Sequence, residues 1–363
     1  LYNMEHEIRQ NIPIMYYNIW DDLPYPFWNE PFYESCDLIM NISKQTQNIV
    51  KNVLRKHPKP DWSVKYVPHG INEKDFYPIE SLHPQYNEYT EYASNFKQKL
   101  DVDFIFFWNN RNIRRKQPAD LILSYKTFCD KLPKEKADKC LLLMNTQIRD
   151  ENGTDLHACK EALCPDYKIE ITNGGVDLKT LNFFYNMSDV VVNIADNEGF
   201  GLSGAEALVT KTPIINNVTG GLQDHMRFED ENGKWIDFTT DIPSNHNGTY
   251  TKHGKWAKPV FPSNRSIQGS PMTPYIFSDR VDFKEVAAAM YYWYDMSITE
   301  RQSCGEAGYD WATGDESNMS AKNMSTLMIK CIDECFEKWT PRKRFTLYKS
   351  ELKNKITNPG VIS

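Results

Sequence analysis

The chain has 363 residues, which is enough for two domains of ordinary size, each with its own hydrophobic core. Hydrophobic residues make up 40% of it and charged residues 25%, and no apolar run approaches the roughly 20 residues that a membrane-spanning helix needs. The formal net charge of -7 argues against a broad electrostatic grip on nucleic acid or anionic lipid, so no stable nucleic-acid binding is expected.

Targeting and metal-binding signals are not found in the sequence. Nothing near the N-terminal end combines basic residues with an apolar stretch, so no secretion signal is predicted. The eight cysteines are scattered, and none stands in a Cys-x-x-Cys pair. Cys159 with Cys164, or Cys331 with Cys335, would need a second pair of matching spacing to hold zinc. The sequence therefore predicts a cytoplasmic protein without a bound metal.

The first part of the chain predicts parallel α/β structure. Short β-like runs at residues 12–17, 37–42 and 64–67 accompany a helical pattern at 44–54, and Pro68, His69 and Gly70 end the third run sharply. The polar, Tyr-rich residues 79–100 are predicted as a linker with a helix. Because a doubly wound domain usually has five or six strands, we expect an upstream part of this domain to be missing from the sequence.

A second α/β series follows this linker. Its expected strands lie at residues 103–108, 140–144, 189–195 and 213–216, and its expected helices at 119–128, 178–185, 203–210, 283–294 and 323–339. Residues 237–280 are rich in Pro, Ser, Gly and Asn, which predicts a long loop or insertion. The predicted organisation is a first Rossmann-like domain at 1–95, a second at 96–320, and a final helix within 321–363 that packs back toward the first domain.

The stretch from Asp189 to Glu206 is the most informative part of the chain. A buried strand is expected to run into a glycine-rich turn, and a helix begins near Ser203. Such a turn aims backbone N–H groups and the positive end of a helix dipole at the space above the strand, where a diphosphate can sit. Glycines alone would indicate only tight packing, but the carboxylates of Glu198 and Glu206 flank the turn and favour a ligand site.

These residues resemble the Glu-x7-Glu motif of retaining glycosyltransferases with the GT-B fold, the large family that includes sucrose and mannosyl transferases. Three further stretches resemble that family in the same order along residues 12–235. They are Arg111-Asn-Ile-Arg-Arg-Lys116, Val67-Pro-His-Gly-Ile-Asn72 with Phe76 and Pro78 after it, and Thr212-Pro-Ile-Ile with Thr219-Gly-Gly-Leu-Gln-Asp224. The resemblance implies an α/β protein of GT-B fold, with two Rossmann-like domains facing a central cleft.

The resemblance also implies roles for individual residues. Arg111 and Lys116 would contact the donor's diphosphate without a metal, Glu198 would contact the donor sugar, and these three are the expected catalytic residues. Glu206 would accept hydrogen bonds from the ribose hydroxyls. The full set of expected donor-binding residues is Glu206, Gly199, Phe200, Gly201, Leu202, Ser203 and Arg115. The alternative for the basic stretch 111–116 is a solvated surface loop. No cofactor is expected beyond the nucleotide-diphosphate sugar, which is the substrate.

The sequence departs from the family on the acceptor side. Many members carry a histidine after the strand that corresponds to residues 12–17, whereas this chain has Asp21 and Asp22 there. Either aspartate is a candidate for that place, and a turn or helix-capping role is the alternative. For His69 a structural role is favoured over a catalytic one. Asp101 and Asp103 have the spacing of a metal motif, but they precede their strand and would lie at the wrong end of it.

Three functions remain open from the sequence. The first is retaining transfer of a sugar from a nucleotide sugar to an acceptor. The second is a phosphorylase or sugar-nucleotide epimerase of the same fold, although no convincing pyridoxal-phosphate lysine is found. The third is a non-catalytic sugar-nucleotide-binding or scaffold protein. The donor base and sugar are not indicated, and the acceptor is a glycan, a lipid-linked sugar, a small molecule or a modified nucleobase.

Overall fold

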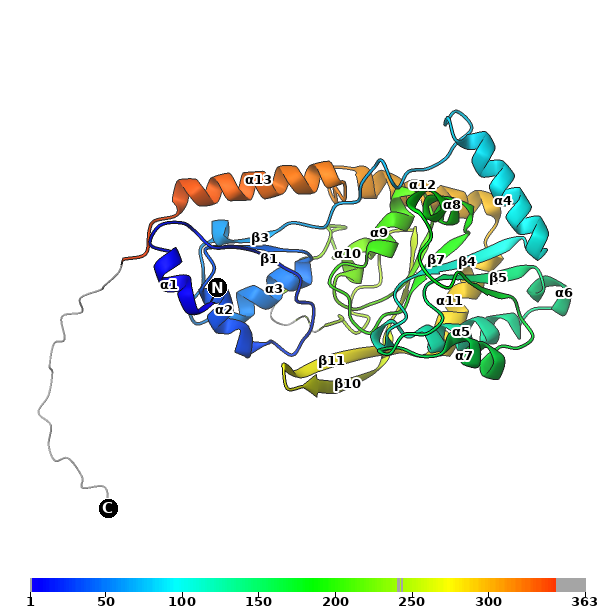
Figure 1. Ribbon diagram of the computed structural model, residues 1–363, viewed down its shortest axis with the longest axis horizontal. Coiled ribbons are helices and arrows are strands. Elements are labelled where there is room, and N and C mark those ends of the chain that lie inside the picture. Colours follow the sequence, from blue (N-terminus) through cyan, green and yellow to red (C-terminus); the bar gives the residue numbers. More distant parts are fainter. Residues whose placement is uncertain (1, 240–241, 243, 344–363) are drawn as a thin grey trace, which may run out of the picture.

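The computed structural model describes residues 2–239, 242 and 244–343. It has two parallel α/β domains side by side, which confirms the predicted fold class (Figure 1). Each domain is built around its own parallel sheet, and a cleft lies between them. Within the described ranges, no helix combines the length and the apolar character that crossing a membrane requires.

The first domain has a three-stranded parallel sheet in the order β1 (Met15–Asn18), β2 (Leu38–Asn41), β3 (Val64–Tyr66). Side chains of β2 alternate between two cores, since successive strand residues point to opposite faces. Ile39 packs in the cluster that includes α3 (Lys44–Val53), and Leu38 and Met40 pack with α13 (Ala321–Lys338). The last described helix therefore completes the first domain, lying along its sheet (Figure 1).

Short helices precede and follow β1 in this domain. They are α1 (Glu5–Ile8), which follows a 3-10 turn at Tyr2–Met4, and α2 (Glu30–Glu34), which follows another at Phe27–Asn29. The longer helix α3 begins at a strong local signal. The Ser43 hydroxyl accepts a hydrogen bond from the Thr46 backbone N–H, a standard N-cap contact.

The second domain has a six-stranded parallel sheet in the order β6-β5-β4-β7-β8-β9. The strands are β4 (Phe104–Asn109), β5 (Cys140–Asn145), β6 (Ile169–Ile171), β7 (Val190–Asn193), β8 (Ile214–Asn217) and β9 (Ala257–Val260). The chain first adds strands outward from β4 on one side and then returns to add β7 on the other. Ligands of open α/β sheets bind outside the carboxyl ends of the strands at such a reversal, which here lies between β4 and β7.

Helices cover both faces of this sheet, and its strands are almost entirely buried, as their continuous apolar runs predict. The core on one face includes α8 (Leu178–Met187) and α9 (Leu202–Val209), with α12 (Ile298–Thr313) packed on α9. The core on the other face includes α5 (Pro118–Cys129) and α11 (Phe283–Asp295). The remaining helices are α4 (Tyr86–Leu100), α6 (Lys134–Ala137), α7 (Leu156–Leu163) and α10 (Leu222–Met226).

The prediction of a long loop or insertion at residues 237–280 holds only in part: the described residues up to 256 form no helix or strand, but residues 257–281 form strands. This part of the chain contains the edge strand β9 and an antiparallel hairpin of β10 (Pro262–Ser270) and β11 (Thr273–Val281). Most of β10 is exposed, so it carries no apolar alternation that would indicate a strand. The hairpin extends from the second domain toward the first (Figure 1). The strand β6 and the helices α7, α10 and α12 were not predicted either.

Within the part of the chain that the structure describes, the chain passes between the domains twice, and the two passages are paired with each other. Ile71 N donates to Met319 O at 2.9 Å, and Ala321 N donates to Ile71 O at 2.9 Å. A Cβ atom at Gly70 would lie 2.5 Å from Ala321 Cα, so only glycine allows this approach. The Pro-His-Gly turn that ends β3 is thereby explained as part of the connection between the domains.

Candidate functional site

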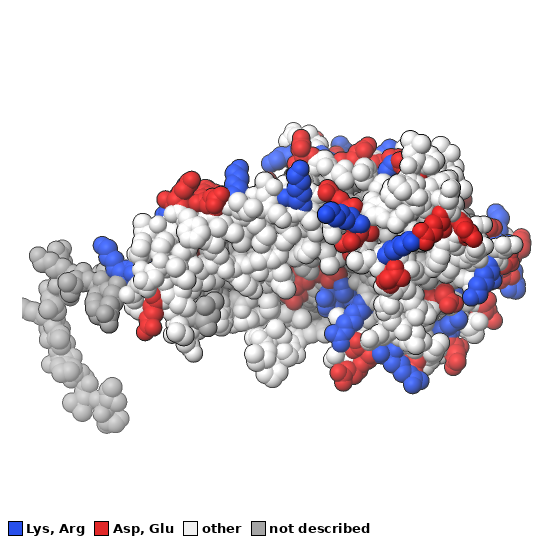
Figure 2. All heavy atoms as spheres, turned by 45° about the horizontal axis from the view of Figure 1, so that its top comes forward, with Lys and Arg blue, Asp and Glu red and all other residues white. Residues whose placement is uncertain are grey.

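A cleft of about 1190 Å³ lies at the carboxyl ends of β4 and β7. The second domain contributes the segments that follow these strands, and the first domain contributes Ile19, Asp21, Asp22, Ile42 and His69. Three residues of the hairpin, Gln268, Ile276 and Arg280, complete the wall. On the face shown in Figure 2, acidic and basic side chains of the described residues are interspersed.

The loop after β7 depends on glycine. Gly201 has φ 87°, in the left-handed region, and α9 begins at the next residue. Gly221 N donates to Glu198 O at 2.7 Å, and a Cβ atom at Gly221 would lie 2.1 Å from Gly199 O. The Thr219-Gly-Gly turn therefore packs directly on the Glu198 loop, which explains why the two stretches occur together. The first-turn N–H groups of α9 are held at the cleft, beside its lining residues Leu202 and Ser203.

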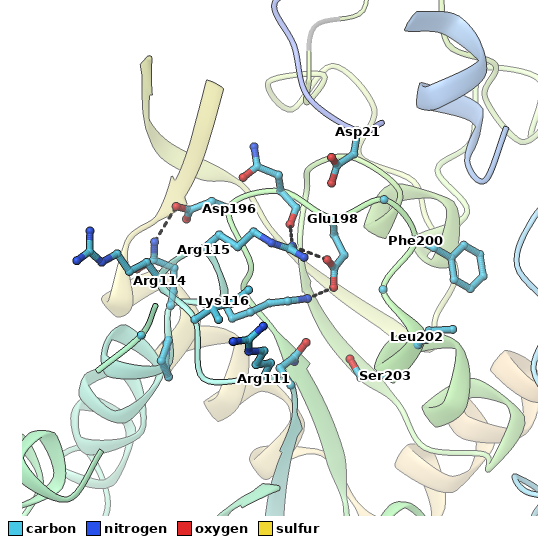
Figure 3. A pocket seen from close by; sticks show the side chains of 18 of the residues that line it. Asp21, Arg111, Arg114, Arg115, Lys116, Asp196, Glu198, Phe200, Leu202 and Ser203 are labelled. Carbon is cyan, nitrogen blue, oxygen red and sulfur yellow. Dashed lines mark hydrogen bonds and ion pairs between the residues drawn. The ribbon is translucent and has the colours of Figure 1, made fainter. Parts of the chain in front are cut away.

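Glu198 lies at the centre of an ion cluster. Its Oε1 pairs with the Nζ of Lys116, and its Oε2 accepts from Arg115 Nη1 at 2.7 Å (Figure 3). Asn193 Nδ2 also donates to Oε1, at 3.5 Å. Glu198 and Lys116 are buried, whereas the Arg115 side chain reaches the cleft surface. Two cations thus converge at the carboxyl ends of β4 and β7, where a donor diphosphate is expected.

The charges of this cluster control its protonation. Burial raises the pKa of Glu198, but the charges and hydrogen bonds of Lys116 and Arg115 outweigh it and hold that pKa below its usual value. Burial lowers the pKa of Lys116, and the charge of Glu198 opposes that effect only in part. Glu198 is therefore ionised at neutral pH and serves as the counter-ion of both cations.

Glu206 has a different environment one helix turn further into the domain. Its Oε2 accepts from the Tyr185 hydroxyl and from Asn109 Nδ2, the latter at 3.3 Å. Asn109 Oδ1 in turn accepts from Asn145 Nδ2 at 2.8 Å. Burial raises the pKa of Glu206, since the hydrogen bonds from Tyr185 and Asn109 compensate only partly. This carboxylate lines the cleft among neutral polar partners, as a group that contacts hydroxyls would.

Arg111 lies in the wall of the same cleft but does not touch Glu198. Its Nε donates to Asp150 Oδ2 at 2.7 Å, and its side chain is 63% exposed. The loop that carries Asp150 is tied down by Asn112, whose Nδ2 donates to the backbone oxygens of Gln147, Ile148 and Thr154. The two cations that contact Glu198 are Arg115 and Lys116, and Arg111 lines the same cleft without such a contact.

The other expected donor-binding residues are brought to the cleft in different ways. Ser203 is buried and accepts from Asn193 Nδ2 at 3.4 Å, and Leu202 is 45% exposed. Phe200 is buried, and its ring packs edge-on against His225 with centroids 4.7 Å apart. Its ring is 5.8 Å from that of His69, so both residues support the loop where the domains meet. Gly199 lies against Ile19 O of the first domain.

Asp21 and Asp22 face this cluster from the first domain. Asp21 points toward Glu198 in Figure 3. Burial raises the pKa values of both aspartates, and the negative charges of Glu198 near Asp21 and of Asp21 near Asp22 act in the same direction. Asp22 Oδ1 is buried and has no hydrogen-bond partner among the described residues. The structure therefore places both candidates at the cleft, where their charges are disfavoured.

Several residues of the site were missed by sequence reasoning. Asp196 Oδ2 accepts from Gln117 Nε2 at 2.7 Å and from Ser278 Oγ at 2.6 Å, which joins the Glu198 loop, the basic turn and the hairpin. Asp196 lies two residues before Glu198, and that proximity was the available signal. Nothing in the sequence near Tyr185 or Ser278 points to the cleft. Among residues 2–239, 242 and 244–343, no group of three or more His, Cys, Asp or Glu side chains could hold a metal ion.

The fold and the cleft together define a class of protein. Two parallel α/β domains enclose paired cations at the switch point of a sheet, beside a glycine-rich turn and a helix N-terminus. That arrangement is typical of proteins that bind a phosphorylated nucleotide between domains.

Comparison with known proteins narrows this class. No family model matches the chain. An uncharacterized glycosyltransferase of Methanocaldococcus jannaschii is 25% identical over 209 residues, which are 56% of this chain and 47% of that protein. A trehalose synthase of Thermococcus litoralis is 28% identical over 108 residues, 29% of this chain and 25% of that protein. The chain thus spans about half the length, or less, of these curated relatives.

The chain is also similar in fold to solved structures. The Anabaena protein HepE, in complex with UDP and glucose, matches 88% of this chain with a TM-score of 0.61 at 12% sequence identity, and the match covers 71% of that chain. The structural neighbours are GT-B glycosyltransferases. This chain therefore has the GT-B fold, and part of its sequence is similar to that of a glycosyltransferase. The fold that the motif resemblance implied is thereby confirmed.

Proposed function

We propose that this chain binds a nucleotide-diphosphate sugar in its cleft and transfers the sugar to an acceptor with retention of anomeric configuration. The observation that carries the proposal is the convergence of Lys116 and Arg115 on Glu198, beside the glycine turn that begins α9. These cations can stabilise the negative charge that develops on a departing diphosphate. UDP-glucose is the first donor to test, since HepE is described in complex with UDP and glucose.

The roles within the cleft follow from their environments. Lys116 and Arg115 would exchange part of their contact with Glu198 for contact with the diphosphate. Glu198 would then face the donor sugar as the carbon–oxygen bond to the diphosphate lengthens. Glu206, with neutral polar partners, would accept hydrogen bonds from the ribose hydroxyls. Glu198 is not proposed as a nucleophile, because its charge is already held by two cations.

Binding and transfer are tested separately. Thermal shift with UDP, GDP and ADP should identify one base, since a ligand of the folded state raises its stability. Release of that nucleoside diphosphate from the sugar donor should follow, and the anomeric configuration of the product, read by NMR, should equal that of the donor. Binding without release would favour a non-catalytic sugar-nucleotide-binding protein. No stabilisation by any nucleotide would contradict the proposal.

We also propose that transfer needs no metal ion. The cations of the cleft are supplied by protein side chains, which can neutralise a diphosphate without a divalent ion. Exhaustive chelation with EDTA should leave nucleoside diphosphate release unchanged. A loss of activity that magnesium or manganese restores would show that a metal takes part.

A further inference from the structure

A second cavity, of about 640 Å³, lies beside the donor cleft on the first-domain side. Its wall comes from β1, from the segment that follows it, from α2, and from Thr273 at the turn of the hairpin. The wall is mainly apolar. Its aliphatic and aromatic residues include Ile14, Tyr16, Ile19, Trp20, Phe32 and Tyr33.

This second cavity adjoins the donor cleft. Ile19, Asp21 and Asp22 line both. The aspartates therefore stand at the boundary between an apolar cavity and the cluster around Glu198. Because Asp22 Oδ1 is buried and lacks a partner among the described residues, a ligand hydroxyl at this boundary would supply the missing hydrogen bond.

The charge of the cavity limits what can occupy it. No Lys or Arg lines it among the described residues, whereas Glu5, Asp21 and Asp22 do. Glu5 is paired with Arg9 and Arg342, but a phosphorylated ligand would approach Asp21 and Asp22 with no Lys or Arg in the described wall of the cavity. An oligosaccharide would leave many hydroxyls unpaired against an apolar wall, which costs free energy. The arrangement favours a neutral molecule with an apolar part and a hydroxyl at one end.

The hairpin holds this arrangement in place. Phe277 N donates to Leu23 O at 2.5 Å, and the Tyr275 ring packs edge-on against Trp28 with centroids 4.3 Å apart. Through Gln268 and Ile276 the hairpin lines the donor cleft, and through Thr273 it lines the second cavity. The hairpin therefore belongs to the wall of both cavities and joins the domains where they meet.

We propose that the second cavity binds the apolar part of the acceptor, and that the acceptor is a neutral alcohol or glycoside bearing an aromatic or alkyl group. This inference rests on the proposed function. Asp21 and Asp22 would orient the attacking hydroxyl toward the donor. The new bond forms between the hydroxyl oxygen and the anomeric carbon while the bond from that carbon to the diphosphate oxygen breaks. The hydroxyl proton passes to the departing diphosphate oxygen, so the products are a glycoside and a nucleoside diphosphate.

Binding of two neutral probes tests the cavity without any donor present. Phenyl β-D-glucoside should bind at least about tenfold more tightly than methyl β-D-glucoside in a ligand-observed NMR titration, since only the phenyl ring can fill the apolar wall. Equal affinities of the two probes would overturn the proposal. This comparison uses the unmodified chain, so it does not depend on any variant folding.

A pair of variants locates the binding. Phe32 lines the cavity and is 51% exposed, and Phe27 is 41% exposed in the neighbouring turn and does not line it. F32S should weaken phenyl β-D-glucoside binding by about tenfold, and F27S should leave it unchanged. An equal response of the two variants would overturn the assignment to this cavity. So would a structure of the full protein in which another segment of the chain fills it.

The two proposals fail in different ways. If no nucleotide binds but the phenyl probe binds and responds to F32S, the proposed donor function fails and the apolar site stands only as a binding site. If UDP or another nucleotide binds and is released from its sugar, but the phenyl probe does not bind, the acceptor proposal fails alone. If both hold, phenyl β-D-glucoside should increase nucleoside diphosphate release over methyl β-D-glucoside, and no such increase would contradict its placement as acceptor.

Discussion

Two glutamates of one loop and helix, Glu198 and Glu206, are both buried at the same cleft and yet have opposite environments. Glu198 is paired with two cations, and its pKa is lowered despite the effect of burial. The hydrogen-bond partners of Glu206 among the described residues are a tyrosine and an asparagine, and none is a cation. Burial raises the pKa of Glu206. The two glutamates have the same chemical group, but their different surroundings suit them to different roles in the cleft.

The two ends of the site therefore differ in the kind of interaction that they offer to a ligand. The Glu198 side organises positive charge that a diphosphate can use. The Glu206 side offers a carboxylate whose interactions are with neutral donors and which can accept hydroxyl hydrogen bonds. Variants that disturb one side should therefore change turnover, and variants that disturb the other should change nucleotide affinity.

The largest effect is expected at Lys116. K116M removes the buried cation beside Glu198, and we expect nucleoside diphosphate release to fall by about 10²–10³-fold. The thermal unfolding midpoint should also fall, because the buried Glu198 then keeps only Arg115, which reaches the cleft surface, as a cationic partner. K126M is the matched control, since Lys126 forms an exposed pair with Asp130 on α5. Equal activities of K116M and K126M would show that the cluster has no part in transfer.

Isosteric changes at the two glutamates test the comparison directly. E198Q should lower turnover by about 10²-fold and leave nucleotide affinity equal or higher, because the two cations lose their counter-ion. E206Q should weaken nucleotide binding by about tenfold, because a charged acceptor of hydrogen bonds is lost. Isothermal titration with the nucleoside diphosphate and a turnover assay give the two readouts. Equal changes of turnover and of nucleotide affinity in the two variants would contradict separate roles for Glu198 and Glu206.

Substitutions of the two arginines at the cleft, Arg115 and Arg111, are expected to change turnover less than K116M does. R115A should reduce turnover by at least about tenfold, because Arg115 contacts Glu198 from the rim of the cleft. R111A should stay within about threefold of the unmodified chain, because the exposed Arg111 pairs with Asp150. Turnover rates of the two variants at one saturating donor concentration measure this difference. A larger loss in R111A would mean that Arg111 leaves Asp150 when the donor binds.

The smallest expected effect is on stability as pH changes. Asp22 has a raised pKa in the folded protein, caused first by burial and then by Asp21. Between the unfolded-state value and this raised value, the folded chain binds more protons than the unfolded chain, so this site's contribution to stability falls as pH rises. D22N should therefore raise the unfolding midpoint by about 1–2 °C at pH 8.5 and change it little at pH 4. An equal shift at both pH values would contradict a titrating Asp22.

The order of the elements and the centre of the site could be predicted from local patterns. Continuous apolar runs indicated the buried strands, since a parallel sheet covered on both faces needs them. Glu198, Glu206 and Lys116 could be assigned to the cleft because each follows, or lies just beyond, a strand whose carboxyl end faces it. The hairpin could not be predicted, because the mostly exposed β10 lacks apolar alternation and because some of the hairpin's contacts are made with the first domain, far away in the chain.

What the sequence determined by itself is the set of chemical groups: two glutamates, neighbouring basic residues and glycines in turns that only they can form. Which arginine reaches Glu198 was decided by tertiary structure. The short turn of Arg114–Lys116 directs Arg115 and Lys116 to a loop that begins some 80 residues later, while Asp150 holds Arg111 aside. The placement of Asp21 and Asp22 at the same cleft also depends on how the domains pack. Local sequence patterns encode backbone geometry over a few residues, whereas these partners are chosen by the docking of segments that lie far apart in the chain.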